Sequence, residues 1–313
     1  MARSPGTLLC LGSGAAFGAM AVFGKLAYVE GVTVGTLLAV RFALAAALFW
    51  GIVAAAGAAR ELRAIGRRDL AIGLGLGGGG YALQAGCYFA ALGRIDASLL
   101  SVLLYSFPAM VAGAAVALGR ERVDARRVAA LALALGGVML VVGGAGTGAI
   151  DPLGAGLAAA AALVYSAYIL VSEGISARLR PQLLSALVCT GAAATLTLAS
   201  AALGELHLGA VTGAGWCWLA ALAVVSTVVA ISLFFAGLRR VGPTSASILA
   251  TAEPVVTVAL AFAVFGETLG ALQLAGGGLV LAAVLALNLR PRRPRVAGLA
   301  AANRGRLPLR AGA

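Results

Sequence analysis

The 313-residue sequence predicts an all-α polytopic membrane protein with ten transmembrane helices arranged as two inverted five-helix repeats. The first observation is composition: apolar residues make up 62% of the chain, charged residues 11%, and the mean hydropathy is +1.03. Soluble domains rarely reach such values. The second is an internal repeat, because the stretch from Ala91 to Leu140 recurs 146 positions later, from Gly237 to Ala286. The third is an uneven distribution of basic residues between successive connections.

Ten apolar stretches are long enough to be membrane spans. A hydrocarbon core about 30 Å thick requires about 20 helical residues, since unsatisfied backbone groups are costly in lipid. In chain order, and numbered here as spans 1 to 10, they are Leu8 to Tyr28, Val34 to Ala56, Leu70 to Leu92, Ala97 to Leu118, Val128 to Ala145, Gly154 to Ser172, Leu183 to Leu203, Trp216 to Leu238, Ser245 to Phe265 and Ala271 to Leu289.

The basic residues predict the orientation of these spans. With the amino terminus inside, twenty arginines fall in inner connections and the tail, and Arg94 alone falls outside. Lys25 and Arg41 lie within spans and complete the 23 basic residues. Since cytoplasmic connections accumulate positive charge, we expect a multi-pass protein of the plasma (inner) membrane with both termini in the cytoplasm. Residues 290–313 are expected to form a disordered basic cytoplasmic tail.

The repeat divides the chain into residues 1–147 (spans 1 to 5) and 148–289 (spans 6 to 10). Chance matches are common in a chain rich in Ala and Leu, so the argument rests on rarer residues, such as Pro108 aligned with Pro254. Five spans is an odd number, so the two halves must cross the membrane in opposite directions. Inverted repeats of this kind recur in secondary transporters, where the halves move around a site near the midplane.

Several motifs stand out along the chain. They are Phe23-Gly24-Lys25-Leu26-Ala27, Val40-Arg41-Phe42, Ala90-Ala91-Leu92 to Ser98, and Gly242-Pro243-Thr244-Ser245-Ala246 through Glu253-Pro254-Val255 to Gly266-Glu267. Together they resemble the EamA family of the drug/metabolite transporter superfamily. The resemblance implies a ten-span export carrier with a central cavity lined mainly by spans 1, 3, 4, 6, 8 and 9. The two halves differ where Phe107 aligns with Glu253 and Arg120 with Gly266, so we expect them to be functionally unequal.

Spans 4 and 9 each carry a polar stripe that ends at a proline. The stripes consist of Ser98, Ser101, Tyr105 and Pro108, and of Thr244, Ser247, Thr251 and Pro254. Their spacing places each set on one helical face. Each proline removes a backbone hydrogen bond and kinks its helix, which frees the carbonyl four residues earlier. We favour substrate binding by Ser101, Tyr105, Ser247 and Thr251; in the alternative, Ser and Thr only join helices, at about 0.6 kcal/mol each.

Tyrosines predict the remainder of the substrate site. Tyr81, Gln84 and Tyr88 share one face of span 3, and Tyr165 and Tyr168 stand three apart in span 6. Aromatic rings suit a small-molecule cavity because they stack, exclude water and carry a hydroxyl group. Tyr88 lies close to a span end, where an interfacial anchor is the alternative interpretation.

Three charged residues lie within spans, at a cost of about 2.5 to 3.5 kcal/mol each on insertion scales. Glu253 is the only carboxylate that deep, and we propose it as the proton-coupling candidate; it could also hold a substrate ammonium group, pair with a cation or cap the broken helix at Pro254. Lys25 and Arg41 could bind a substrate carboxylate. The alternatives are snorkelling of Lys25 to the interface and a packing role for Arg41.

Two further patterns are explained without ligand binding. Gly75, Gly77 and Gly80 match the GxGxxG pattern, but they lie inside a span, so close helix packing is the preferred interpretation. Glu121 and Glu267 precede spans 5 and 10, and we expect each carboxylate to favour the dipole of the helix that follows it.

The sequence therefore predicts a carrier that exports a small polar or amphipathic metabolite, such as an amino acid, by alternating access. The expected partners are the lipid bilayer, the substrate and, as candidates, protons and a second copy in a homodimer; no nucleic acid, cofactor or metal is expected. A multidrug-type efflux carrier and a non-transporting receptor or scaffold are alternatives. An enzyme is disfavoured, because the only histidine, His207, lies in a connection and no carboxylates are paired within spans.

Overall fold

The protein is a helical bundle in which every predicted span is occupied by helix. The computed structural model describes residues 5–57, 65–119, 125–143, 151–176, 178–241, 246 and 249–288, and no strand occurs in these ranges. Its elements are α1 (Pro5–Gly18), α2 (Met20–Val29), α3 (Val34–Ala55), α5 (Arg67–Gly75), the π-helix η1 (Leu76–Tyr81), α6 (Ala82–Leu92), α7 (Ala97–Leu104), α8 (Phe107–Ala117), α9 (Ala125–Gly143), α10 (Pro152–Ser176), α11 (Pro181–Ala202), the short η2 (Leu208–Ala210), α12 (Gly213–Ala223), the π-helix η3 (Val224–Val229), α13 (Ala230–Val241), α15 (Ala252–Phe265) and α16 (Ala271–Asn288).

The predicted ten-span fold is confirmed. Six described helical runs are long and apolar enough to cross a membrane, and three shorter apolar helices lie within spans 5, 9 and 10. The remaining span, formed by α5, η1 and α6, belongs to neither group, since its glycine-rich sequence lowers its hydropathy. The expected tail at 290–313 lies outside the described residues.

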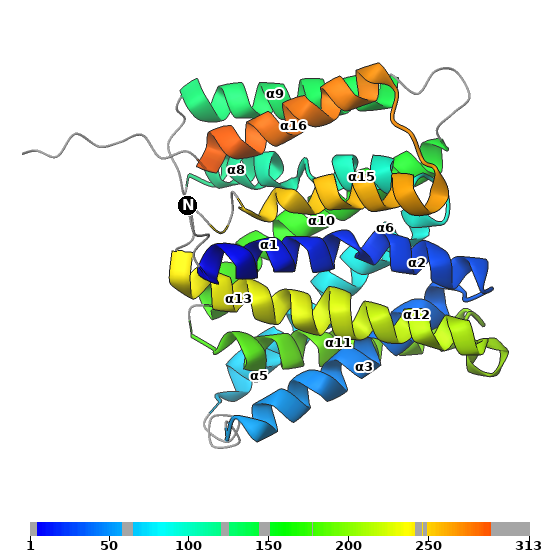
Figure 1. Cartoon of the computed structure of the whole chain (residues 1–313). Coiled ribbons are helices and arrows are strands. Elements are labelled where there is room, and N and C mark those ends of the chain that lie inside the picture. The colour runs from blue at the N-terminus through cyan, green and yellow to red at the C-terminus, as the bar shows by residue number, and fades with distance from the viewer. Residues whose placement is uncertain are drawn as a thin grey trace, which may run out of the picture.

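The helices run side by side, with α9 and α16 packed together along one side of the bundle (Figure 1). Helix α1 packs between α13 and α15. We call the end of the bundle that holds the α15–α16 connection the Glu267 end. Span 4 begins at this end with α7, where Ala97 N–H meets the Glu267 carboxylate, whereas its repeat counterpart, span 9, finishes there with α15. The two halves are therefore inverted.

Spans 4 and 9 are interrupted just before their prolines. In span 4, α7 ends at Leu104 and α8 starts at Phe107, and in span 9, α15 starts at Ala252, directly after a turn at Thr251. The ring nitrogen of Pro254 cannot donate to the carbonyl of Ala250, four residues earlier. The hydroxyl of Tyr105 lies 2.8 Å from this carbonyl oxygen and donates to it.

Two π-helices occupy equivalent places in the two halves. η1 lies in span 3 and η3 in span 8, and Tyr81 of η1 aligns with Thr227 of η3 under the repeat offset. A π-helix inserts an extra residue into a turn and is often found at functional sites. The two π-helices therefore indicate a candidate functional site between spans 3 and 8.

The glycine run of span 3 brings its backbone against α11. A Cβ atom at Gly77 would overlap the backbone of Val188, and one at Gly80 would lie 3.1 Å from the ring of Tyr168. Gly75 has nothing within 4 Å of its Cβ position. Close helix packing thus accounts for Gly77 and Gly80.

We expect Gly77→Ala to destabilise the protein by about 1 to 3 kcal/mol, because the backbone of Val188 cannot turn away as a side chain can. Gly75→Ala is the matched control, and there the gain in helix propensity should leave stability equal or higher. Thermal unfolding in detergent measures both variants. Equal Tm values for the two would contradict the close approach of η1 and α11.

Candidate functional site

Arg41 in α3 is the one charged residue in the described ranges that is fully buried, with 2% of its surface exposed. Its Nε donates to Thr227 Oγ1 at 3.0 Å, and its guanidinium lies over the rings of Phe42 and Phe89, 5.0 and 5.2 Å from their centroids. None of the ion pairs between described residues includes Arg41. The structure thus holds a buried cation whose charge these residues do not neutralise.

Thr227, in the π-helix η3, is positioned to accept a hydrogen bond from Arg41. The Thr227 hydroxyl donates to the carbonyl of Leu222, five residues earlier, at 2.9 Å. A hydroxyl has one hydrogen and two lone pairs, so its remaining capacity is to accept. Arg41 takes this position with Nε, which leaves its terminal nitrogens free to donate elsewhere.

A continuous series of rings leads away from Arg41. Its neighbouring ring pairs have centroid distances of 5.4, 5.6, 6.3, 4.6 and 5.8 Å. Edge-on and offset contacts at such distances are favourable. We call this series the aromatic arc; in order, it consists of Phe42, Tyr81, Tyr168, Tyr165, Phe107 and Tyr105. Because Tyr165 and Tyr168 come from α10, the arc combines both halves of the protein.

The arc ends at Glu253. The hydroxyl oxygen of Tyr105 lies 3.0 Å from Glu253 Oε2, and Glu253 forms no ion pair with any described lysine or arginine. Thr251 lies at the adjoining helix break. The arc therefore separates a buried cation at one end from a carboxyl group at the other.

The other predicted residues surround this arrangement. Gln84 and Tyr88 are buried in α6, and Tyr88 packs edge-on against Phe89, the ring that contacts Arg41. The side chains of Gln84 and Ser101 form no hydrogen bond with described residues. In these ranges only Ser226 Oγ is both fully enclosed and without a partner, so the polar side-chain atoms of Gln84 and Ser101 are not fully enclosed. The predicted Ser247 lies outside the described residues.

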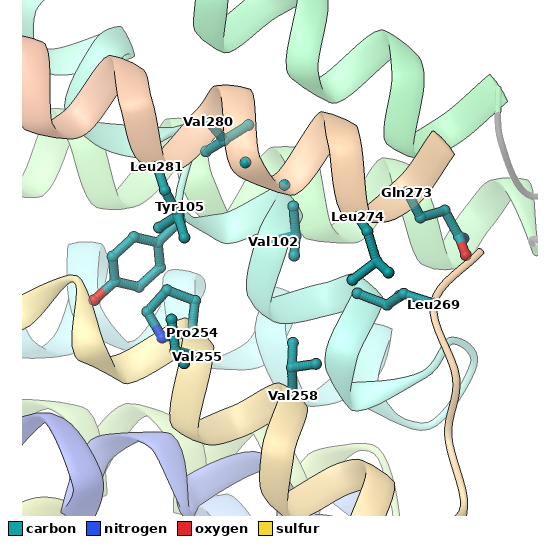
Figure 2. A pocket seen from close by; sticks show the side chains of 12 residues that line it. Val102, Tyr105, Pro254, Val255, Val258, Leu269, Gln273, Leu274, Val280 and Leu281 are labelled. Carbon is teal, nitrogen blue, oxygen red and sulfur yellow. The ribbon is translucent and has the colours of Figure 1, made fainter. Parts of the chain in front are cut away.

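A pocket with a volume of about 270 Å³ lies beside the Tyr105 end of the arc. Figure 2 shows side chains of α16 facing Pro254, Val255 and Val258 of α15 across it, with Tyr105 at one end and Gln273 at the other. Its lining is almost wholly apolar. The contribution of span 10 was not expected from the sequence.

Lys25, predicted as a substrate-binding residue, is engaged at the Glu267 end. Its Nζ lies 2.6 Å from Glu267 Oε1 and 3.5 Å from Asp96 Oδ1. The Glu267 carboxylate also accepts hydrogen bonds from the N–H groups of Ala97 and Ser98 and from the Ser98 hydroxyl. The substrate role of Lys25 remains a prediction, and its present partners are carboxylates of the protein.

The expected role of Glu267 needs correction, because it caps α7 rather than the helix that follows it. The first N–H groups of a helix have no partner within the helix and attract a carboxylate. The α15–α16 connection carries Glu267 to those of α7 instead. Burial opposes ionisation of this group, but hydrogen bonds from Lys25, Ser98 and Ala97 outweigh it, and the pKa of Glu267 is held below its usual range.

Sequence reasoning missed three residues of the site as ligand-facing candidates. In the sequence, Phe42 stands next to Arg41 in a recognised motif, Phe107 is the counterpart of Glu253, and Thr227 is the counterpart of Tyr81. The signal was available in the repeat, because counterparts of functional residues in an inverted repeat approach the same central region.

Fold and site together define a class: a multi-pass membrane protein of the transporter type, with a site between two inverted halves. The chain belongs to the EamA-like transporter family, whose sequence model matches residues 4–143 and, a second time, residues 152–289. This family is part of the drug/metabolite transporter superfamily.

Individual relatives agree with this assignment. An uncharacterized transporter of Archaeoglobus fulgidus is 32% identical over 224 residues, which cover 72% of this chain and 78% of the relative. The uncharacterized transporter YcbK of Bacillus subtilis is 27% identical over 293 residues, covering 91% and 93%. A solved crystal structure with 20% identity matches with a TM-score of 0.64 over 91% of this chain and 97% of its own, and shares the fold.

The depressed pKa of Glu267 predicts a pH-dependent contribution to stability. This contribution is fully present above the ordinary glutamate pKa of about 4.3 and is lost as the pH falls through the lower folded-state value. We expect wild type to have a higher Tm than Glu267→Gln at neutral pH, and the difference to shrink under acid conditions. The exposed Glu205, as Glu205→Gln, is the control. A difference that does not change with pH would contradict the assignment.

Proposed function

We propose that the protein exports a small metabolite that carries a carboxylate, with an amino acid as the leading candidate, across the plasma membrane by alternating access. The observation that carries this proposal is Arg41, a buried cation without a carboxylate partner among the described residues. A buried charge is costly unless an opposite charge or hydrogen bonds compensate it. A substrate carboxylate would supply both to the free guanidinium nitrogens.

The chemistry along the arc suits an amino acid. Its carboxylate would bind Arg41, its apolar portion would contact the rings, and its ammonium group would face Glu253 or the tyrosine hydroxyls. Tyr81 belongs to the arc and, like Tyr88, lies within electrostatic range of both Arg41 and Glu253. The two charged residues therefore share one region of the bundle, as binding of a zwitterion requires.

The inverted halves support alternating access. In the proposed orientation the Glu267 end faces outward. In the structure, ion pairs and a hydrogen bond join the helices at this end. The ion pairs Lys25 with Glu267 and Arg94 with Asp151 lie there, together with the hydrogen bond from Thr212 to Glu30. Release of substrate to the outside would require these contacts to separate. The proposed direction of transport rests on the resemblance to export carriers, and the proposed orientation rests on the distribution of arginines.

A multidrug-type carrier is the second candidate, favoured by the apolar pocket between α7, α15 and α16. Such a carrier would accept apolar or cationic compounds and would not depend on Arg41. Metabolite export profiling of overexpressing and deletion cells separates the two candidates. A receptor or scaffold would give no substrate-dependent flux in proteoliposomes under any condition.

We expect Arg41→Gln to reduce flux of the identified carboxylate substrate in proteoliposomes by about tenfold or more, since charged hydrogen bonds contribute about 1.5 to 3 kcal/mol. Arg41→Lys should retain part of the flux, because it keeps the charge but loses the planar donor set. Arg239→Gln, at an exposed position of α13, is the control. Normal flux in folded, correctly inserted Arg41→Gln would refute the role of Arg41.

A further inference from the structure

The two short contacts of the Tyr105 hydroxyl determine how many hydrogen atoms must lie between these groups. The hydroxyl oxygen of Tyr105 lies 2.8 Å from the carbonyl oxygen of Ala250 and 3.0 Å from Glu253 Oε2. A tyrosine hydroxyl has a single hydrogen, whereas a carbonyl oxygen and an ionised carboxylate only accept. One hydrogen shared between two acceptors would form two weakened bonds. Two full bonds require a second hydrogen, and Glu253 is the group that can supply it.

We propose that Glu253 carries a proton in this conformation and that Tyr105 couples this proton to the helix break of span 9. The Glu253 carboxyl donates to the Tyr105 oxygen, and Tyr105 donates to Ala250. This proton-binding site deepens the proposed function, on which its link to transport rests. The proton count itself depends only on the contacts of Tyr105.

Loss of the proton changes the hydrogen bonding at the break. When Glu253 releases its hydrogen to water, the carboxylate becomes an acceptor, and the Tyr105 hydroxyl turns from Ala250 to Glu253. The Ala250 carbonyl, already deprived of its helical partner by Pro254, then has no donor among the described residues. An unsatisfied carbonyl in a membrane span costs several kcal/mol, so the break must rearrange or admit water.

The groups that face Glu253 include no cation among the described residues. Tyr81, Tyr88, Tyr105 and Tyr165 lie within electrostatic range, and all four are neutral at ordinary pH. Of the helices packed against α15, α1 contributes only Cys10 as a titratable group, which lies against Gly237.

Helix α2 also packs against α15 and brings two titratable side chains. Lys25 is paired with Glu267, and Tyr28 donates to the carbonyl of Phe89. Helix α7 contributes Tyr105 at its end. The described surroundings therefore offer Glu253 hydroxyl groups and no compensating charge.

Contacts of α1 connect the break to Arg41. A Cβ atom at Gly18 would lie 2.9 Å from the carbonyl oxygen of Glu253, so α1 rests directly on the start of α15. On the same helix, Ser13 donates to the carbonyl of Ala230 at 2.8 Å. Ala230 directly follows η3, the π-helix that presents Thr227 to Arg41. A rearrangement at the break can therefore be transmitted through packed contacts of α1 to the Arg41 end of the arc.

Infrared difference spectroscopy of the reconstituted full-length protein tests the proposal without any substrate. We expect a protonated-carboxyl C=O band at neutral pH that disappears at alkaline pH and is absent in Glu253→Gln. In Tyr105→Phe the band should remain and shift to higher wavenumber, because the acid loses its hydrogen-bond acceptor. Tyr28→Phe, which removes a hydroxyl bonded elsewhere, should leave the band unchanged.

Two results would overturn the inference. One is a wild-type spectrum at neutral pH without a carboxyl band that Glu253→Gln removes. The other is a band at the same wavenumber in Tyr105→Phe, provided that this variant is folded by thermal unfolding. Because the spectra require no transport, failure to find flux would count against the proposed function alone. An ionised Glu253 in an active carrier would count against this inference alone.

Discussion

The need to satisfy every backbone carbonyl inside lipid is the constraint on which the site depends. Pro254 breaks span 9 and releases the carbonyl of Ala250, and a side chain from the other half of the protein, Tyr105, satisfies it. The same side chain contacts Glu253 and is the last ring of the aromatic arc. A single backbone defect is therefore satisfied by a contact between spans 4 and 9, and the same contact holds the acid at the end of the aromatic arc.

The spans could be predicted from the sequence because hydropathy and backbone satisfaction are local requirements. Span 2 illustrates this, since the expected Val34 to Ala56 is α3, Val34–Ala55. The partners of the site residues could not be predicted in the same way. Lys25 and Glu267 are 242 positions apart, and their pairing depends on how a connection folds across the bundle end. Periodicity gives the face of a helix but does not identify what that face contacts.

The unequal halves also explain why the repeat was informative only in part. Phe107 and Glu253 are counterparts, yet both belong to the same site, one within the aromatic arc and the other at its end. Comparing the copies pairs positions such as Phe107 and Glu253. It did not identify their chemistry, because the residue types diverged after duplication while the backbone positions were kept.

The paired π-helices have a consequence for the direction in which a ligand lies. Tyr81 and Thr227 occupy the same place in the two copies, so a site between them straddles the pseudo-twofold axis. Two identical copies would bind a ligand equally well in either of two opposite poses. In this chain one position is an aromatic ring and the other is an acceptor for Arg41. The two sides of the region therefore differ, and a ligand bound between them would favour one of the two poses.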